Sequence, residues 1–189
     1  MSFLARRTAG SYLANIQTFT TTQVVPVPVS VSNAVVELWG ETGFGGHGNN
    51  AIPTQGGGGG SGGYTMVSFP VNNAGSFSLV MGIGGGGTTS TVTPASIPGF
   101  PTLSAPGGGN GAIATAGAGG AAGTAGAIGT GGTTNSVGMA GTAGDTAGIG
   151  KGGAAVVGIN GTGNAGSDGN YSTTTNTAGK PAVCVIKWT

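Results

Sequence analysis

A glycine recurs at every third position through the central part of this chain. From Gly108 to Gly153 it fills 13 of 16 consecutive positions of one three-residue phase, and no proline occurs between Gly107 and Lys180. A flexible linker keeps no such phase. A period of three indicates an extended left-handed helix with three residues per turn and no internal hydrogen bonds. Its amides must therefore find partners on neighbouring segments.

Collagen meets this demand with proline-rich triplets on three chains, and those prolines are absent here. The sequence instead predicts a bundle of parallel and antiparallel helices of the polyglycine II type, in which glycine backbones pack directly against one another. A Cβ atom at these contacts would hold the neighbouring backbones apart.

The two other columns of the repeat differ in character. The residues that directly follow the glycine phase include many polar side chains, and the next column holds every Ile and Val of the stretch. We therefore expect each helix to have a packing edge, a wet edge and an apolar edge. Asn135 and Ala147 replace glycine in the main phase, and Thr133–Ser136 is expected to be a reversal. The polar set is Thr115, Thr124, Thr130, Thr133, Ser136, Thr142, Asp145 and Lys151.

The flanking sequence predicts β-strands instead. Strands are expected at Val35–Trp39, Tyr64–Phe69, Ser76–Ile83 and Ala182–Trp188. Residues 70–75, which include two asparagines, suit a hairpin. Pro26 and Pro28 confine their segment to an edge or a bend. The run 56–63 is either a loose loop or a short extra helix of the bundle.

The predicted fold class is thus mainly β or irregular, with almost no α-helix. A small β-sandwich, 17–83 plus 181–189, would carry a glycine-rich bundle over 84–180, and residues 1–16 would form an attachment arm. The arm residues expected to contact a neighbouring protein are Phe3, Leu4, Arg6, Arg7 and Tyr12.

Composition disfavours several functions. The 189 residues include 45 glycines, five Lys or Arg and four Asp or Glu, for a net charge of +1. Scattered cations do not favour nucleic-acid binding. No apolar stretch is long enough to span a membrane, and the N-terminus lacks the apolar core of a secretory signal.

Catalysis is short of candidate groups. One histidine, one cysteine and four carboxylates would have to supply any site, so we expect no enzyme, no cofactor and no metal. Cys184 is interpreted as a core residue, and Asp168 as a solvated turn residue. Matches to GxGxxG lack the helix that dinucleotide binding requires.

The segment 19–46, with its VELWG motif, resembles the opening of glycine-rich proteins from bacteriophage tail and tail-fibre genes, and AVCVIKW resembles their final strand. The triplet core is similar to the tail-fibre tip adhesins of T4-like phages, in which loops at the end of a polyglycine II bundle bind bacterial receptors. Glu41 and Thr42 depart from the pattern, since these proteins continue there directly into glycine.

The resemblance implies a virion protein that is made in the host cytoplasm. It would bind other tail or fibre proteins and a bacterial receptor, either a glycan or an outer-membrane protein, as a homotrimer or a single monomeric tip. The candidate loops are 88–100, 133–136 and 171–176. The expected receptor-binding residues are Phe44, His47, Thr88, Phe100, Thr133, Asn135, Tyr171, Thr174 and Asn176. For Phe100, a structural role as a plug at the end of the bundle is the alternative.

Two other functions stay open. The chain could be an architectural virion component, such as a fibre cap or decoration protein, with no receptor of its own. It could also be an ice-binding protein, because flat Thr and Ala faces on a polyglycine II bundle resemble those of springtail antifreeze proteins.

Overall fold

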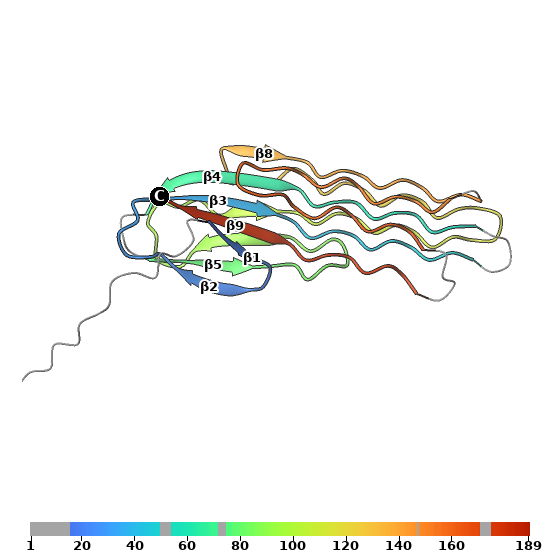
Figure 1. Ribbon diagram of the computed structural model, residues 1–189, viewed down its shortest axis with the longest axis horizontal. Coiled ribbons are helices and arrows are strands. Elements are labelled where there is room, and N and C mark those ends of the chain that lie inside the picture. The colour runs from blue at the N-terminus through green and yellow to red at the C-terminus, as the bar shows by residue number, and fades with distance from the viewer. Residues whose placement is uncertain (1–15, 50–53, 72–74, 147, 171–174) are drawn as a thin grey trace, which may run out of the picture.

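A computed structural model describes residues 16–49, 54–71, 75–146, 148–170 and 175–189. In these residues the chain forms no α-helix, and its strands make two antiparallel sheets. The sheets pack face to face at one end of an elongated molecule (Figure 1). Extended segments continue from the strands and run together to the other end. The mainly β fold expected from the sequence is confirmed.

The first sheet has five strands in the order β1-β9-β3-β4-β8. The C-terminal strand lies between two early strands and pairs antiparallel with both. The strands are β1 (Ile16–Phe19), β9 (Val183–Trp188), β3 (Asn33–Trp39), β4 (Tyr64–Pro70) and β8 (Thr134–Ser136).

The second sheet has four strands in the order β2-β5-β6-β7. They are β2 (Gln23–Pro26), β5 (Ser76–Val80), β6 (Ser90–Pro94) and β7 (Leu103–Ala105). The proline-bearing strand β2 is an edge strand, in agreement with its sequence. The predicted hairpin over 70–75 is wrong, because β4 and β5 belong to different sheets.

The core between the sheets follows the period of two in the strands. In β3, Ala34, Val36 and Leu38 face the other sheet and are fully buried. Alternate residues face the opposite side of the first sheet, where Trp39 and Tyr64 form a second cluster. The Trp39 indole N–H donates to the Val156 carbonyl at 2.8 Å. The loop that carries Val156 thus covers this outer face.

Residues 54–63 form the central helix of the bundle, and all of them are buried. Because the helix turns once every three residues, its N–H groups point toward three neighbours in turn. Those of Gly57, Gly60 and Gly63 all donate to one neighbour, at 2.8 to 3.1 Å. The three antiparallel segments that accept bonds from the central helix are 106–112, 139–145 and 167–170. The glycine run is therefore a helix of the bundle and not a loose loop.

The carbonyl groups of the central helix accept bonds from three further segments. Gly120, Gly123 and Gly126, for example, donate to it at 2.8 to 2.9 Å. The segments that donate to these carbonyl groups are 40–46, which runs antiparallel to the central helix, and 120–126 and 150–153, which run parallel to it. Neighbours in the shell also bond to each other, as Gly109 does to Thr124 at 2.8 Å. One chain thus supplies a central helix and all the segments that surround it.

Glycine is required in the bundle for close approach. A Cβ atom built on Gly58 would lie 2.0 Å from the Lys151 carbonyl oxygen, and one on Gly57 would lie 2.0 Å from that of Ala121. Neither glycine has a positive φ angle. Backbone packing, and not left-handed backbone geometry, therefore fixes these positions as glycine.

The apolar column of the repeat is largely exposed. Ile113, Ile128 and Val137 are each about half exposed, at 48 to 54%. The physical reason is that the backbones already fill the space between helices, so side chains of both other columns point outward. Burial in the bundle is mostly burial of glycine backbone.

The domain boundaries also differ from those expected. Strands β6, β7 and β8 lie inside the range 84–180 that was assigned to the bundle, yet each belongs to a sheet. Segments 40–46 and 56–63 lie inside the range assigned to the sandwich, yet they are bundle helices. The chain passes between the two parts repeatedly, because bundle helices continue the strands of the first sheet (Figure 1).

Candidate functional site

The end of the bundle far from the sheets gathers polar residues from several segments. The His47 N–H donates to the Asn176 side-chain oxygen at 3.1 Å, and the His47 ring nitrogen Nδ1 lies 2.9 Å from the Gly48 carbonyl. Asn49 and Thr54 pair in an isolated antiparallel β-bridge. The structure therefore brings two predicted site residues, His47 and Asn176, into contact.

The interior of this tip is built on the first residues of the central helix. The Thr54 hydroxyl donates to the Thr115 carbonyl at 3.1 Å, and the Gln55 N–H donates to the Asp145 carbonyl at 3.1 Å. Gln55 is only 8% exposed, and its side-chain oxygen has no hydrogen-bond partner. A buried acceptor without a partner costs about 1–3 kcal/mol. The tip thus holds an unused acceptor that sequence reasoning did not identify.

Other predicted site residues fall on or beside the far end. Phe44 is half-buried on the same segment as His47, and its N–H donates to the Asn110 side chain at 3.0 Å. Tyr171 and Thr174 lie outside the described residues, as do the arm residues Phe3, Leu4, Arg6, Arg7 and Tyr12.

The predicted loop 88–100 does not belong to the tip. It contains strand β6, and Phe100 is 5% exposed in the core of the sandwich. Its ring packs edge-on against Phe69 and Phe77, with centroids 5.3 and 4.8 Å away. The expectation that Phe100 contacts a receptor is therefore wrong, and so is the alternative of a plug at the bundle's end. Thr88 is exposed, but it lies where the sandwich meets the bundle.

The segment 133–136 lies where the chain reverses between bundle segments 120–126 and 139–145, as predicted, and its residues 134–136 also form an edge strand of the first sheet. The Thr133 N–H donates to the Met66 carbonyl at 2.8 Å, beside the pairing of β8 with β4. Asn135 is half-buried and donates to the Gly132 carbonyl at 3.0 Å. These residues lie at the sandwich, away from His47 and Asn176.

Two buried carboxylates organise loops instead of forming a reactive pair. Glu41 accepts from the Gly84 and Thr88 N–H groups, at 2.8 and 2.9 Å. It holds a run of four glycines, 84–87, all with positive φ. The Thr42 hydroxyl accepts from the Lys180 N–H at 2.8 Å. These contacts give Glu41 and Thr42 structural roles at the point where the chain enters the bundle.

Glu37 holds the loop that covers the outer face of the first sheet. Its carboxylate accepts from the Tyr64 hydroxyl at 2.8 Å and from the Ile159 and Asn160 N–H groups at 2.6 and 2.7 Å. Burial and the neighbouring Glu37 raise the pKa of Tyr64 well above its ordinary value. The buried acid in VELWG could have been suspected from its place within an apolar strand.

The remaining ionisable groups have structural surroundings. Cys184 is fully buried in β9, and burial raises the pKa of its thiol. Asp168 accepts from the Gly152 N–H at 2.8 Å and pairs with Lys151 at 3.0 Å, on the side of the bundle. The Gly152 hydrogen bond is the main cause of the lowered pKa of Asp168. The Asp168 side chain is thus half-exposed, and it also forms a hydrogen bond and an ion pair with a neighbouring helix of the bundle.

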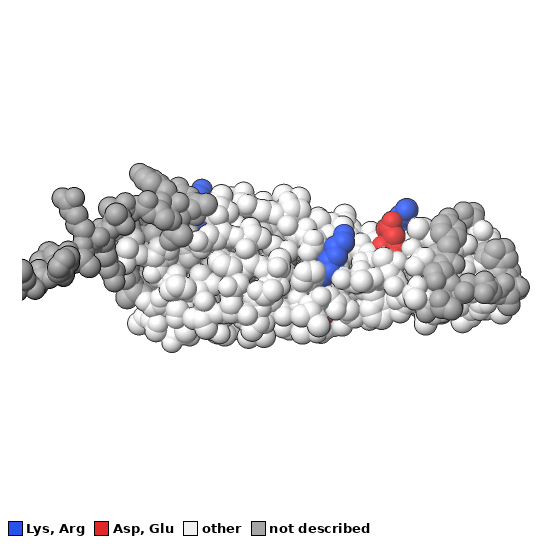
Figure 2. All heavy atoms as spheres, turned by 60° about the horizontal axis from the view of Figure 1, so that its bottom comes forward, with Lys and Arg blue, Asp and Glu red and all other residues white. Residues whose placement is uncertain are grey.

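Charged side chains are sparse on the described part of the face that Figure 2 shows. Among the described residues, no three of the types His, Cys, Asp and Glu gather where they could hold a metal ion. The described part of the chain also has no helix of the length and apolarity that a membrane span requires.

Fold and site together define a β-sandwich that carries a polyglycine II bundle with a polar tip. The chain matches no protein-family model, and no curated protein is significantly similar to it.

Proposed function

We propose that this protein is a bacteriophage tail-fibre tip protein that binds a receptor on the host surface through the far end of its bundle, without catalysis. The proposal rests on which residues lie at the two opposite ends of the molecule. Ile16 pairs with Lys187, so the described chain begins beside its C-terminal strand at the sandwich. His47 and Asn176 lie at the opposite end, on the turns of the bundle.

The construction of the bundle supports this role. The described helices that end at the tip are fixed along their length by backbone hydrogen bonds, so residues at their ends can change without disturbing a side-chain core. Rigid scaffolds with exposed loops commonly carry binding residues. The tip is rich in amide and hydroxyl groups and carries one carboxylate, Asp145, so it suits a polar receptor surface, either a glycan or a loop of an outer-membrane protein.

The sandwich end would then face the virion and bind a neighbouring tail or fibre protein. All segments around the central helix come from the same chain, so the bundle is complete without a second copy. This favours a single monomeric tip over a homotrimer.

The test is binding of the purified protein to intact bacteria from a panel of candidate hosts. The variant replaces Tyr171–Asn176 with Gly and Ser residues. The control replaces two exposed sandwich residues, by Val29→Ser and Ser30→Gly. Saturable binding that the loop variant loses and the control keeps is the expected result. Equal binding by all three proteins, or binding to no strain, would contradict the proposal.

An architectural role in the virion is the second candidate. Its support is a set of exposed apolar side chains on the bundle and its base, suited to packing against another protein. The set is Ile128, Val137, Met139, Val157 and Ile159, which are 50 to 72% exposed. This role predicts that replacing the tip loops leaves infection unchanged.

A further inference from the structure

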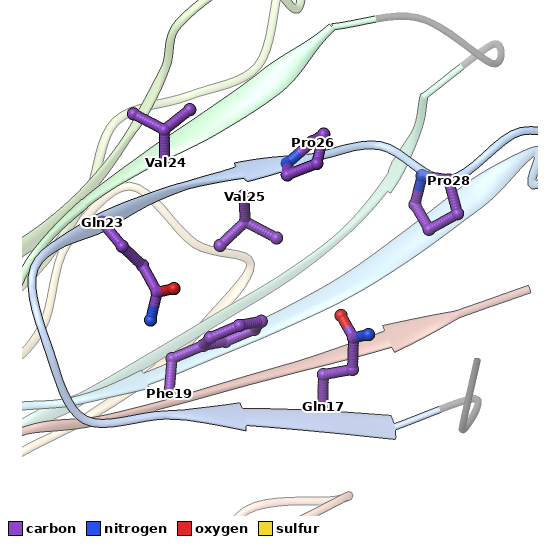
Figure 3. Close-up of a pocket in the computed structure, with 7 residues that line it drawn as sticks. All are labelled: Gln17, Phe19, Gln23, Val24, Val25, Pro26 and Pro28. Carbon is purple, nitrogen blue, oxygen red and sulfur yellow. The ribbon is translucent and has the colours of Figure 1, made fainter.

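A groove lies on the open side of the sandwich, between edge strands β1 and β2 (Figure 3). On the opposite side Thr130 joins the two sheets, because its backbone pairs with Ser104 of β7 and its carbonyl accepts from the Thr65 hydroxyl of β4. The groove has a volume of about 280 Å³, close to the lower end of the usual range for small-molecule sites, about 300–1,000 Å³. Its size suits a ligand of one ring. The described lining residues are Gln17, Phe19, Gln23, Val24, Val25, Pro26 and Pro28.

The walls of the groove are apolar and uncharged. Val25 is buried, and Phe19 is partly buried against the core of the sandwich. Figure 3 shows Phe19 between Gln17 and Gln23, with all three side chains pointing into the space between the two strands. None of the described lining residues is charged, so a charged ligand would lose hydration here without gaining a partner. The groove therefore selects a neutral ligand that has an apolar face.

Each of the two amides in the groove has one of its polar atoms already bonded. The Trp188 indole nitrogen can only donate, so the Gln17 atom that it contacts at 3.0 Å is the oxygen, and the Gln17 NH₂ group is left to donate. On the facing strand the Gln23 NH₂ group donates to the carbonyl and the hydroxyl of Thr21, at 3.5 and 3.3 Å, which leaves the Gln23 oxygen to accept. Within the described part of the chain, neither remaining group has a further partner. The groove thus offers one donor and one acceptor, on either side of Phe19.

We propose that the groove binds a neutral saccharide, with one pyranose ring stacked on Phe19 and its hydroxyl groups bonded to Gln17 and Gln23. The face of a pyranose carries C–H groups, which suit an aromatic side chain, and each hydroxyl at the ring edge can both donate and accept. One ring therefore meets the Gln17 donor and the Gln23 acceptor together. Apolar walls with a few placed polar groups are typical of small-molecule sites. The groove lies on the sandwich, so this site is independent of the receptor site proposed for the tip.

Two other classes of ligand match the groove less well. A nucleic acid would bring phosphates, and no described Lys or Arg lines the groove to neutralise them. An extended peptide would bind mainly through backbone hydrogen bonds to a strand edge. β2 carries Pro26, which has no N–H, and β1 has only four residues, of which alternate ones direct their backbone groups toward β9. The side-chain amides are thus the main polar groups on offer, and they suit hydroxyl groups.

Titration of the isotope-labelled full-length protein with sugars, followed by NMR, tests the site. The neutral probes are methyl α-glucopyranoside, methyl α-mannopyranoside and methyl β-galactopyranoside, and glucuronate is the charged counterpart. We expect at least one neutral sugar to shift the side-chain amide signals of Gln17 and Gln23 saturably, with a Kd on the order of 1 mM. Glucuronate should bind roughly tenfold more weakly, because its charge finds no partner. No shift with any neutral sugar at about 100 mM, roughly a hundredfold above that Kd, or equal binding of glucuronate, would overturn the proposal.

Substitutions then separate the contacts. Gln23→Ala removes the acceptor, and Phe19→Leu removes the flat ring but keeps an apolar side chain. Thr18→Ala is the matched control, because Thr18 is exposed on the same strand and lies outside the lining. Affinity for the sugar should fall by roughly fivefold or more in the first two variants and stay unchanged in the control. Folded Gln23→Ala and Phe19→Leu proteins that bind like the wild type would contradict the proposal, as would an equal loss in Thr18→Ala. Tighter binding of an uncharged valine–alanine tetrapeptide than of every sugar would show that the groove is a peptide site instead.

Discussion

Adding a single methyl group to the central helix should destabilise the whole bundle. In Gly58→Ala, the new Cβ would lie 2.0 Å from the Lys151 oxygen, whereas ordinary contact begins at 3.4 Å. The neighbouring segment would have to move outward by about 1.4 Å, which is the difference between these two distances. Gly58 has no positive φ, so alanine adds no backbone strain of its own.

The magnitude follows from what this displacement breaks. The displaced segment is held by the Gly150 N–H, which donates to the Gly56 carbonyl at 2.9 Å, and by the Gly153 N–H, which donates to the Gly59 carbonyl at 2.9 Å, both on the buried central helix. Overpacking costs about 1–3 kcal/mol, and each buried group left without a partner costs about 1–3 kcal/mol. We expect the free energy of unfolding to fall by about 3–5 kcal/mol, a large part of the usual total of about 5–15 kcal/mol.

Urea denaturation of wild type and variant measures this change. Gly148→Ala is the matched control, because a Cβ there meets nothing within 4 Å and its φ is not positive. The control should stay within about 0.5 kcal/mol of the wild type or gain slightly, since alanine reduces the freedom of the unfolded chain. A Gly58→Ala protein as stable as the control would refute close packing of backbones as the reason for glycine.

Three further predictions concern the sandwich. Phe100→Ala should lower the free energy of unfolding by about 3–5 kcal/mol, while the folded protein still binds bacteria. A variant that keeps full stability but loses binding would show that Phe100 belongs to the receptor site. Glu37→Gln should cost about 1–3 kcal/mol, because an amide NH₂ replaces an oxygen that accepts an N–H, and exchange in 158–161 should quicken; unchanged exchange there would contradict the role of Glu37. In an ultraviolet titration of the folded protein to pH 11, Tyr64 should stay protonated. Since its folded pKa is raised, the folded state holds the proton longer, and stability should fall as pH rises above about 10; ionisation of all three tyrosines in the folded protein would show that Tyr64 is not enclosed.

The candidate site was only partly predictable from sequence. His47 lies between two glycines and Asn176 lies in a polar segment, and the structure brings both residues together at the tip. Phe100 is flanked by Gly99 and Pro101 and therefore has the same local appearance, yet it packs in the core. Nothing local distinguishes the two cases, because burial of Phe100 depends on Phe69 and Phe77, which come from strands of different sheets.

The sequence by itself determined the local conformations. A period of three with glycine fixes an extended helix whose backbone must bond sideways, and a period of two with β-branched residues fixes strands such as β3 and β9. Only the tertiary structure decided which helix is central and which neighbours surround it. The physical reason is that glycine carbonyl and N–H groups are alike at every position of the repeat, so lateral hydrogen bonds alone do not specify a partner. The strands that continue into the bundle set that order, because their side chains select their neighbours through the core of the sandwich.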